Sequence, residues 1–179
     1  MSILILQPFA TDTAPKGVSI TANVSRNANM LAVQFSLADL QSSVMIQPCA
    51  TAPARRDNLW QATCFEFFLS QKNSPAYWEF NLSPSGDWNI YHFNAYRQGL
   101  REEKAFSVLP FSVEQSANYL ALSLSIDLSP IVASEKSVDL GITAVIQTKR
   151  GDISYWALNH CGDKPDFHLR ESFLVSCGA

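Results

Sequence analysis

Two strand-like stretches of the sequence carry carboxylates among aromatic side chains, and these carboxylates are the residues best suited to chemistry. LWQATCFEFFLS places Glu66 between phenylalanines, and YWEFNLSPSGDWNIYHF contains Glu79 and Asn81. A buried, unpaired carboxylate is costly, so we expect a cation, a hydrogen-bond donor or a ligand hydroxyl near each one. The alternative is that both face solvent, as polar residues of antiparallel sheets often do, or pair with an arginine. The candidate arginines are Arg97, Arg101 and Arg170.

Side-chain alternation decides which of these residues can meet, because neighbouring residues of a strand point to opposite faces. Glu79 and Asn81 therefore share a face, and the turn sequence SPSG follows them. A loop with an odd number of residues pairs Asn81 with Asn89, and in the same register Glu79 opposes Tyr91. A register shifted by one residue turns Trp88 toward that face instead. The sequence leaves both registers open.

The mixture of flat aromatic rings with planar polar groups is the chemistry that sugar recognition requires. Aromatic faces stack on the C–H surfaces of a sugar, and carboxylates and amides hydrogen-bond its paired hydroxyls. Glu66 shares a face with Trp60, which makes Trp60 a candidate for stacking. The residues thus favour the binding of a small molecule, with a sugar as the expected class.

The rest of the chain predicts β-strands that would position these side chains. Helical periodicity is nearly absent, and runs of β-branched and aromatic residues recur between turn signals. We predict an all-β fold, an antiparallel β-sandwich of two sheets, in one domain over residues 1–179. The expected strands cover residues 2–7, 17–26, 30–37, 60–70, 76–83, 87–93, 119–126, 138–148, 152–158 and 172–176. A short helix is expected over residues 128–134, with Ser129 as its cap and Pro130 in the first helical position.

Three connections are longer than a hairpin needs, and long loops on a rigid sandwich are where binding groups tend to lie. These connections are residues 38–59, 94–115 and 159–170.

Composition argues against several classes of partner. The formal charge is −3 and the 13 basic residues are scattered, so neither nucleic acid nor an anionic membrane surface is an expected partner. No stretch approaches the roughly 20 apolar residues of a membrane helix, and the N-terminus lacks the basic region of a secretion signal. We therefore expect a cytoplasmic protein. Its four cysteines form no CxxC pair and are expected to be reduced thiols.

Three segments resemble, in order and spacing, a group of bacterial DOMON-like proteins, which is similar to family 9 carbohydrate-binding modules. The segments are LWQATCFEFFL, YWEFNLSPSGDWNIYHFNAYRQG and YWALNHCGDKPDFHLRESFLV, and the resemblance runs from about Leu59 to the C-terminus. It implies a β-sandwich in which aromatic residues clamp a sugar while Glu, Asn, Gln and Arg side chains hydrogen-bond it. The final loop departs from the modules, which tend to have a Phe-Gly pair where this sequence reads PDFHLRESF.

The resemblance also assigns expected roles by position. It implies that Glu66, Glu79, Asn81 and Arg97 orient the ligand, and that a tryptophan stacks on it. Together with the residue patterns it gives the full set of expected ligand contacts: Trp60, Glu66, Glu79, Asn81, Trp88, Tyr91, Arg97, Trp156, His160 and His168.

Other chemistries remain as alternatives. A glycoside hydrolase would need two carboxylates on facing walls, and Glu66 and Glu79 could supply them. An interaction protein would instead cover its aromatic face with another subunit. A homodimer with Tyr77, Tyr91 and Phe93 in its interface is one such arrangement.

No cofactor is expected. A zinc site could draw on His160, Cys161, Asp166 and His168, but their spacing matches no structural zinc pattern. Haem could be held by methionine and His92, although methionine more often fills a gap in a core.

Overall fold

The computed structural model describes residues 3–10 and 14–178, and these form β-strands joined by loops and two single-turn 3-10 helices. The predicted beginning of the first strand, residue 2, lies outside the described residues. The strands are β1 (Leu4–Pro8), β2 (Val18–Asn27), β3 (Met30–Asp39), β4 (Cys64–Gln71), β5 (Tyr77–Leu82), β6 (Trp88–Phe93), β7 (Arg101–Glu102), β8 (Phe111–Ser116), β9 (Tyr119–Asp127), β10 (Val138–Gln147), β11 (Ile153–Ala157) and β12 (Val175–Cys177). The 3-10 helices are η1 (Leu59–Gln61) and η2 (Arg170–Ser172).

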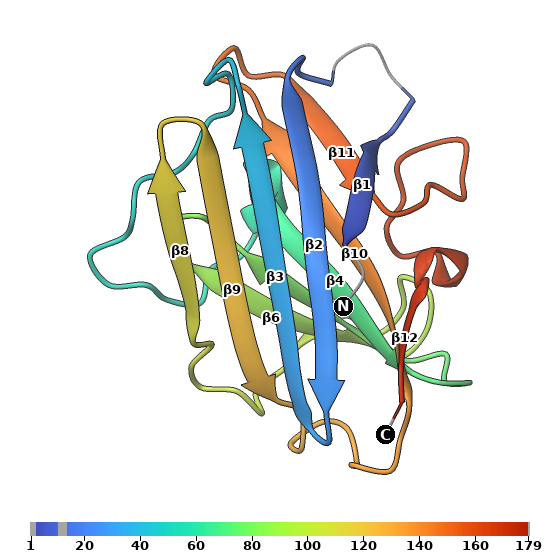
Figure 1. Ribbon diagram of the computed structural model, residues 1–179. Coiled ribbons are helices and arrows are strands. Elements are labelled where there is room, and N and C mark those ends of the chain that lie inside the picture. Colours follow the sequence, from blue (N-terminus) through green and yellow to red (C-terminus); the bar gives the residue numbers. More distant parts are fainter. Residues whose placement is uncertain (1–2, 11–13, 179) are drawn as a thin grey trace.

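The strands form two layers, and the pairings between the named strands are antiparallel, which confirms the all-β prediction (Figure 1). Layer A has the order β1-β2-β3-β9-β8, and layer B the order β7-β6-β5-β4-β10-β11 with β12 beside β10. Strand β1 belongs to both layers, because its Leu4 to Leu6 pair with β2 and its Gln7 and Pro8 pair with β11. The two layers are therefore one continuous sheet that curls over on itself.

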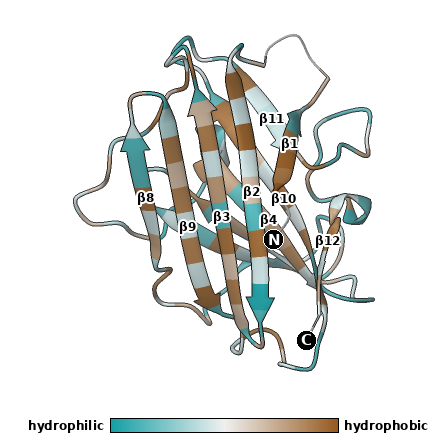
Figure 2. Cartoon of the chain, viewed as in Figure 1, coloured by the Kyte–Doolittle hydropathy of each residue, from teal (hydrophilic) through white to brown (hydrophobic). Residues whose placement is uncertain are grey.

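The main core lies between the two layers. Along β3 and β9 hydrophobic residues alternate with more polar ones, as the banding of these strands in Figure 2 shows. Phe35 from layer A meets Phe65 from layer B with their ring centroids 5.2 Å apart, and both side chains are fully buried. Alternation thus turns one face of each layer toward the main core and the other face away from it. We call the face that points away the outer face of the layer.

Several predicted elements differ from those observed. The predicted strand 60–70 begins only at Cys64, because residues 59–61 form η1. The predicted helix 128–134 is a single turn in which Ile131 and Val132 donate to the Leu128 carbonyl, and it is capped by Asp127 rather than Ser129. The connection 94–115 contains β7 and most of β8, which were not predicted.

The hairpin of β5 and β6 has the odd-loop register. Asn81 pairs with Asn89 and Glu79 with Tyr91, so the shifted register is excluded. The turn closes when the Gly86 amide donates to the Ser83 carbonyl and the Ser83 amide donates to the Asp87 carbonyl. This register places Glu79, Asn81, Asn89 and Tyr91 together on the outer face of layer B.

We expect Gly86→Ala to destabilise the protein more than Gly151→Ala. Both glycines have left-handed backbones, with φ of +92° and +95°, so alanine costs roughly 1–2 kcal/mol at either site. At Gly86 the added Cβ would also lie 2.9 Å from the Cγ of Pro53, whereas at Gly151 it meets no atom within 4 Å. Chemical denaturation of the two variants measures the difference, and equal losses of stability would contradict this packing of residue 53 on the hairpin turn.

Among the described residues, no helix is long and apolar enough to cross a membrane.

Candidate functional site

The outer face of layer B carries the polar residues that the sequence singled out. Glu66 on β4 lies beside Asn81 on β5, and Glu79 lies beside Phe68 in the next row of the same two strands. A sheet face exposed to solvent would present such side chains to water, but Glu66 is only 2% exposed and Glu79 only 7%. Something must therefore cover this face.

The cover comes from the connection between β11 and β12, residues 158–174, which we call the covering segment. Phe167 and Phe173 of this segment pack against Phe68 and Tyr77 of the sheet. Together they build a second hydrophobic cluster, which we call the outer core. Its members are Phe68, Tyr77, Tyr91, Phe93, Val145, Ala157, Phe167 and Phe173.

A cavity of about 200 Å³ remains beside the outer core, between the sheet and the covering segment. Two of the three segments predicted as long connections reach this cavity, 94–115 through Arg97 and 159–170 through Phe167, while Trp60 comes from η1. The full lining is Trp60, Glu66, Phe68, Glu79, Arg97, Val145, Tyr155, Pro165, Phe167 and His168.

The two carboxyl groups of the cavity differ in how they are held. Glu79 Oε1 accepts a hydrogen bond of 2.9 Å from the Asn81 side-chain amide. Glu66 Oε1 is buried and has no hydrogen-bond partner among the described residues. Burial raises the pKa of Glu66 well above its ordinary value, with the nearby Glu79 adding to the effect, and burial likewise raises the pKa of Glu79. Both groups are therefore biased toward the protonated form.

His168 is fixed beside Glu79 by the outer core. Its Nδ1 lies 2.8 Å from the Tyr77 hydroxyl, which already accepts a hydrogen bond from the Arg97 amide. The Tyr77 hydroxyl can therefore donate its own proton to Nδ1, which leaves the ring proton on Nε2. Nε2 lies 3.9 Å from Glu79 Oε2, and burial lowers the pKa of His168 to about 4. At neutral pH the imidazole is neutral and does not offset the carboxylates.

Arg97 is engaged with the covering segment rather than with the carboxyl groups. Its Nη2 lies 2.9 Å from Asp166 Oδ1, and the Tyr96 hydroxyl donates to the other oxygen of Asp166 at 2.6 Å. The remaining candidate partners are engaged elsewhere, since Arg101 donates to Asn94 and Arg170 to Asp139. None of these three arginines forms an ion pair with Glu66 or Glu79.

The structure brings five of the predicted site residues to the cavity wall, namely Trp60, Glu66, Glu79, Arg97 and His168. Two others lie directly behind this wall. Asn81 is fully buried and orients Glu79. Tyr91 packs against Trp60 with the ring centroids 5.8 Å apart, and its hydroxyl donates to Asp57 at 2.7 Å.

Three predicted contacts do not reach the cavity. Trp88 and Trp156 lie on the inner face of layer B, 5% and 4% exposed, and belong to the main core. Trp88 packs under the Arg55 guanidinium, and Trp156 donates to Ser154. His160 Nε2 lies 3.0 Å from the carbonyl oxygen of Gln7, a residue of β1. A ligand in this cavity would not touch these three residues.

Three aromatic residues of the cavity were not predicted as ligand contacts, namely Phe68, Tyr155 and Phe167. Tyr155 adjoins Trp156 and therefore points to the opposite face of β11. The pairing of Tyr155 with Val145 on β10 fixes which of the two neighbours is outside. Phe167 has no strand periodicity around it, so only its place in the aromatic-rich last loop could have suggested a role.

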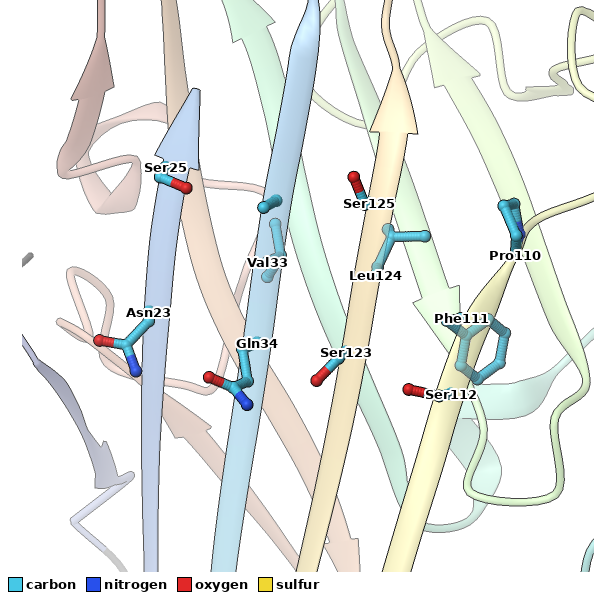
Figure 3. Close-up of a pocket in the computed structure, with 11 residues that line it drawn as sticks. Asn23, Ser25, Val33, Gln34, Pro110, Phe111, Ser112, Ser123, Leu124 and Ser125 are labelled. Carbon is cyan, nitrogen blue, oxygen red and sulfur yellow. The ribbon is translucent and has the colours of Figure 1, made fainter. Parts of the chain in front are cut away.

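A larger groove of about 670 Å³ lies on the outer face of layer A, but its chemistry is plainer (Figure 3). Small amides and hydroxyls from four strands line it, and no titratable side chain is among them. The labelled polar residues are Asn23, Ser25, Gln34, Ser112, Ser123 and Ser125. Because it holds no buried polar group without a partner, we take the smaller cavity on layer B as the candidate site.

The side chains that could bind a metal ion are not arranged as a metal centre. Within the described residues, no three His, Cys, Asp or Glu side chains are grouped as metal ligands. Of the proposed zinc ligands, His168 is engaged by Tyr77 and His160 by Gln7.

The fold is shared with solved carbohydrate-binding proteins at low sequence identity. A proposed carbohydrate-binding protein from Bacteroides uniformis aligns with a TM-score of 0.68 and 14% identity, covering 97% of this chain and 85% of the other. A family 9 carbohydrate-binding module from Caldicellulosiruptor kristjanssonii, solved with glucose, aligns with a TM-score of 0.57 and 11% identity over 93% of this chain and 78% of the module.

The same type of module, solved with cellotriose, aligns with a TM-score of 0.59 and 10% identity over 99% of this chain and 81% of the module. No protein-family model and no curated protein matches the sequence. These likenesses show a fold in common with family 9 carbohydrate-binding modules.

Proposed function

We propose that this protein binds a carbohydrate in the cavity between layer B and the covering segment. The observation that carries the proposal is the buried Glu66 Oε1, which lacks a partner at the wall of a cavity. An unpaired buried oxygen is costly, and a ligand hydroxyl would satisfy it. The sugar complexes of the structurally similar modules support the same ligand class.

The aromatic side chains at the cavity supply the apolar part of such a site. Trp60 and Tyr155 are each 38% exposed, unlike the buried rings of the outer core, so both can still present ring surface to a ligand. We assign stacking on the sugar to Trp60 and Tyr155. Tyr155 takes the stacking role that the sequence had suggested for Trp88 or Trp156, which lie in the main core. Glu66 and Glu79 then bind hydroxyls, and Arg97 borders the ligand from the opposite loop.

The size of the cavity limits the ligand. Its volume of about 200 Å³ is below the roughly 300 Å³ at which pockets for drug-sized molecules begin. We therefore propose that one sugar ring is enclosed, and that any further rings extend into solvent. Membership of the DOMON-like group remains a prediction from the sequence motifs.

Hydrolysis of a glycoside is supported less well. Such chemistry requires one protonated and one ionised carboxyl group, held in environments that push their pKa values apart. Here burial raises the pKa of both Glu66 and Glu79.

The homodimer considered from the sequence is also supported less well. Its expected interface residues, Tyr77, Tyr91 and Phe93, are buried within the chain's own outer core and are not available to a second subunit.

Tryptophan fluorescence tests the proposal directly. Of the four tryptophans, Trp60 is the one at the cavity, while Trp78, Trp88 and Trp156 lie in the main core. Titration with monosaccharides should change the emission of the wild-type protein, and Trp60→Phe should remove this response. Trp60→Ala should weaken binding by roughly tenfold, as expected from losing about 1.5 kcal/mol of stacking. A response retained in Trp60→Phe would place the ligand elsewhere.

A further inference from the structure

The charge balance of the cavity points to a narrower ligand class. Two buried carboxyl groups, Glu66 and Glu79, line a cavity whose single arginine is already bonded to an aspartate. No lysine is in the lining, and His168 is held by Tyr77 at Nδ1. Arg97 acts on Glu79 only through space and partly offsets the effect of burial on its pKa, and no cation does the same for Glu66. The cavity therefore contains acceptors for positive charge, and no protein cation forms an ion pair with Glu66.

We infer that the bound sugar carries an ammonium group beside Glu66 and Glu79, so that the preferred ligand is an amino sugar. This inference rests on the proposed function and deepens it. An ammonium group has three donors and no acceptor, and a carboxylate has acceptors alone. The unpartnered Oε1 of Glu66 is the first acceptor for it, and Glu79 Oε2, which makes no hydrogen bond among the described residues, is the second.

A neutral sugar would use this cavity less well. Hydroxyls can bond a protonated carboxyl group, but they do not relieve the repulsion that opposes the ionisation of two adjacent carboxylates. An ammonium group relieves this repulsion, because its positive charge lies between the two carboxylates. Its hydrogen bonds are also charge-assisted, and such bonds are about twice as strong as neutral ones. We expect an amino sugar to bind roughly tenfold to a hundredfold more tightly than the corresponding hexose.

Binding of an ammonium group should also release protons. In the free protein, burial favours the protonated forms of Glu66 and Glu79, and a bound cation would shift both toward carboxylates. The other titratable groups facing them are Cys64 on β4, Tyr77 on β5, Tyr91 on β6, Arg97 on the loop after β6, Tyr155 on β11, and His168 on the covering segment. Variants of the two glutamates separate their contribution from that of these neighbours.

Calorimetry of the whole protein tests the inference. Glucosamine, galactosamine and mannosamine would be titrated beside glucose, galactose, mannose and N-acetylglucosamine, each in two buffers of different ionisation enthalpy. The expected result is tighter binding of at least one amino sugar than of its hexose and its acetylated form, with proton release for the amino sugar alone. Glu66→Gln and Glu79→Gln should weaken binding of the hexose as well, because both residues bind hydroxyls, but they should weaken binding of the amino sugar more, so that the preference disappears. Glu114→Gln, at an exposed position on layer A, should behave as wild type.

Three outcomes would overturn the inference. Equal affinity for an amino sugar and its hexose excludes the ammonium contact but leaves the proposed sugar site standing. Cyclohexylamine, an amine without ring hydroxyls, is titrated as a further control, and binding as tight as that of glucosamine would show that the sugar is not recognised. No binding of any sugar removes the proposed function, and the inference with it. Circular dichroism of each glutamine variant verifies that loss of the preference is not loss of the fold.

Discussion

Replacing Phe68 by alanine should destabilise the protein by about 3–5 kcal/mol and detach the covering segment from the sheet. The Phe68 ring touches Phe167, His168 and Phe173, with centroid distances of 6.5, 5.1 and 5.7 Å. These contacts hold the covering segment against layer B, since the segment has little regular structure of its own. Because the cavity lies between segment and sheet, the same variant should also lose ligand binding.

Phe67→Ala is the matched control. Phe67 is the neighbouring residue of β4 and is equally buried, but it points to the main core and stacks on Phe80 with centroids 4.3 Å apart. Its truncation should cost a similar free energy of unfolding. Hydrogen exchange should then separate the two variants, with faster exchange of residues 158–174 in Phe68→Ala alone. Equal exchange of this segment in both variants would contradict the role of the outer core.

Replacing Glu66 by glutamine should make the protein more stable than wild type at high pH. Burial raises the pKa of Glu66 in the folded state above the ordinary 4.5. The native protein therefore binds more protons than the unfolded chain between these two values, and wild-type stability falls as pH rises through that interval. Glutamine does not ionise, so Glu66→Gln lacks this loss. The stability difference should grow by up to about 1.4 kcal/mol per pH unit until Glu66 ionises.

His168 acts in the opposite direction over part of this range. Burial lowers its pKa from 6.5 to about 4, so its contribution to stability grows as pH rises between those values. The comparison is therefore clearest above pH 6.5, where His168 is neutral in both states. Urea denaturation of wild type, Glu66→Gln and the exposed control Glu114→Gln at a series of pH values gives the result. A difference between wild type and Glu66→Gln that does not change with pH anywhere above 4.5 would show that burial does not raise the pKa of Glu66.

The part of the site that lies on strands follows from sequence. Alternation alone puts Glu79 and Asn81 on one face, and the turn after them allows the register that joins them to Asn89 and Tyr91. The expectation of a donor near each carboxylate holds for Glu79, which accepts from Asn81, whereas Glu66 Oε1 has no partner among the described residues. These arguments are local, which is why the sequence supports them.

The parts that failed depend on pairings between distant segments. Trp156 was assigned a stacking role through the resemblance to the carbohydrate-binding modules, but the pairing with β10 turns Trp156 inward. Strand β8 is an edge strand exposed along most of its length, so its sequence shows little hydrophobic alternation. The covering segment has no periodicity, and its docking through Phe167 and Phe173 could not be read from its residues.

The central claim is that the cavity over β4 and β5 binds a sugar, and amide chemical-shift mapping tests it most directly. Titration of isotope-labelled protein with a panel of monosaccharides and amino sugars should shift amide signals around Trp60, Glu66, Glu79 and His168. Signals from the groove on layer A, around Gln34 and Ser123, should stay unchanged. Shifts confined to that groove, or none with any sugar, would contradict the account.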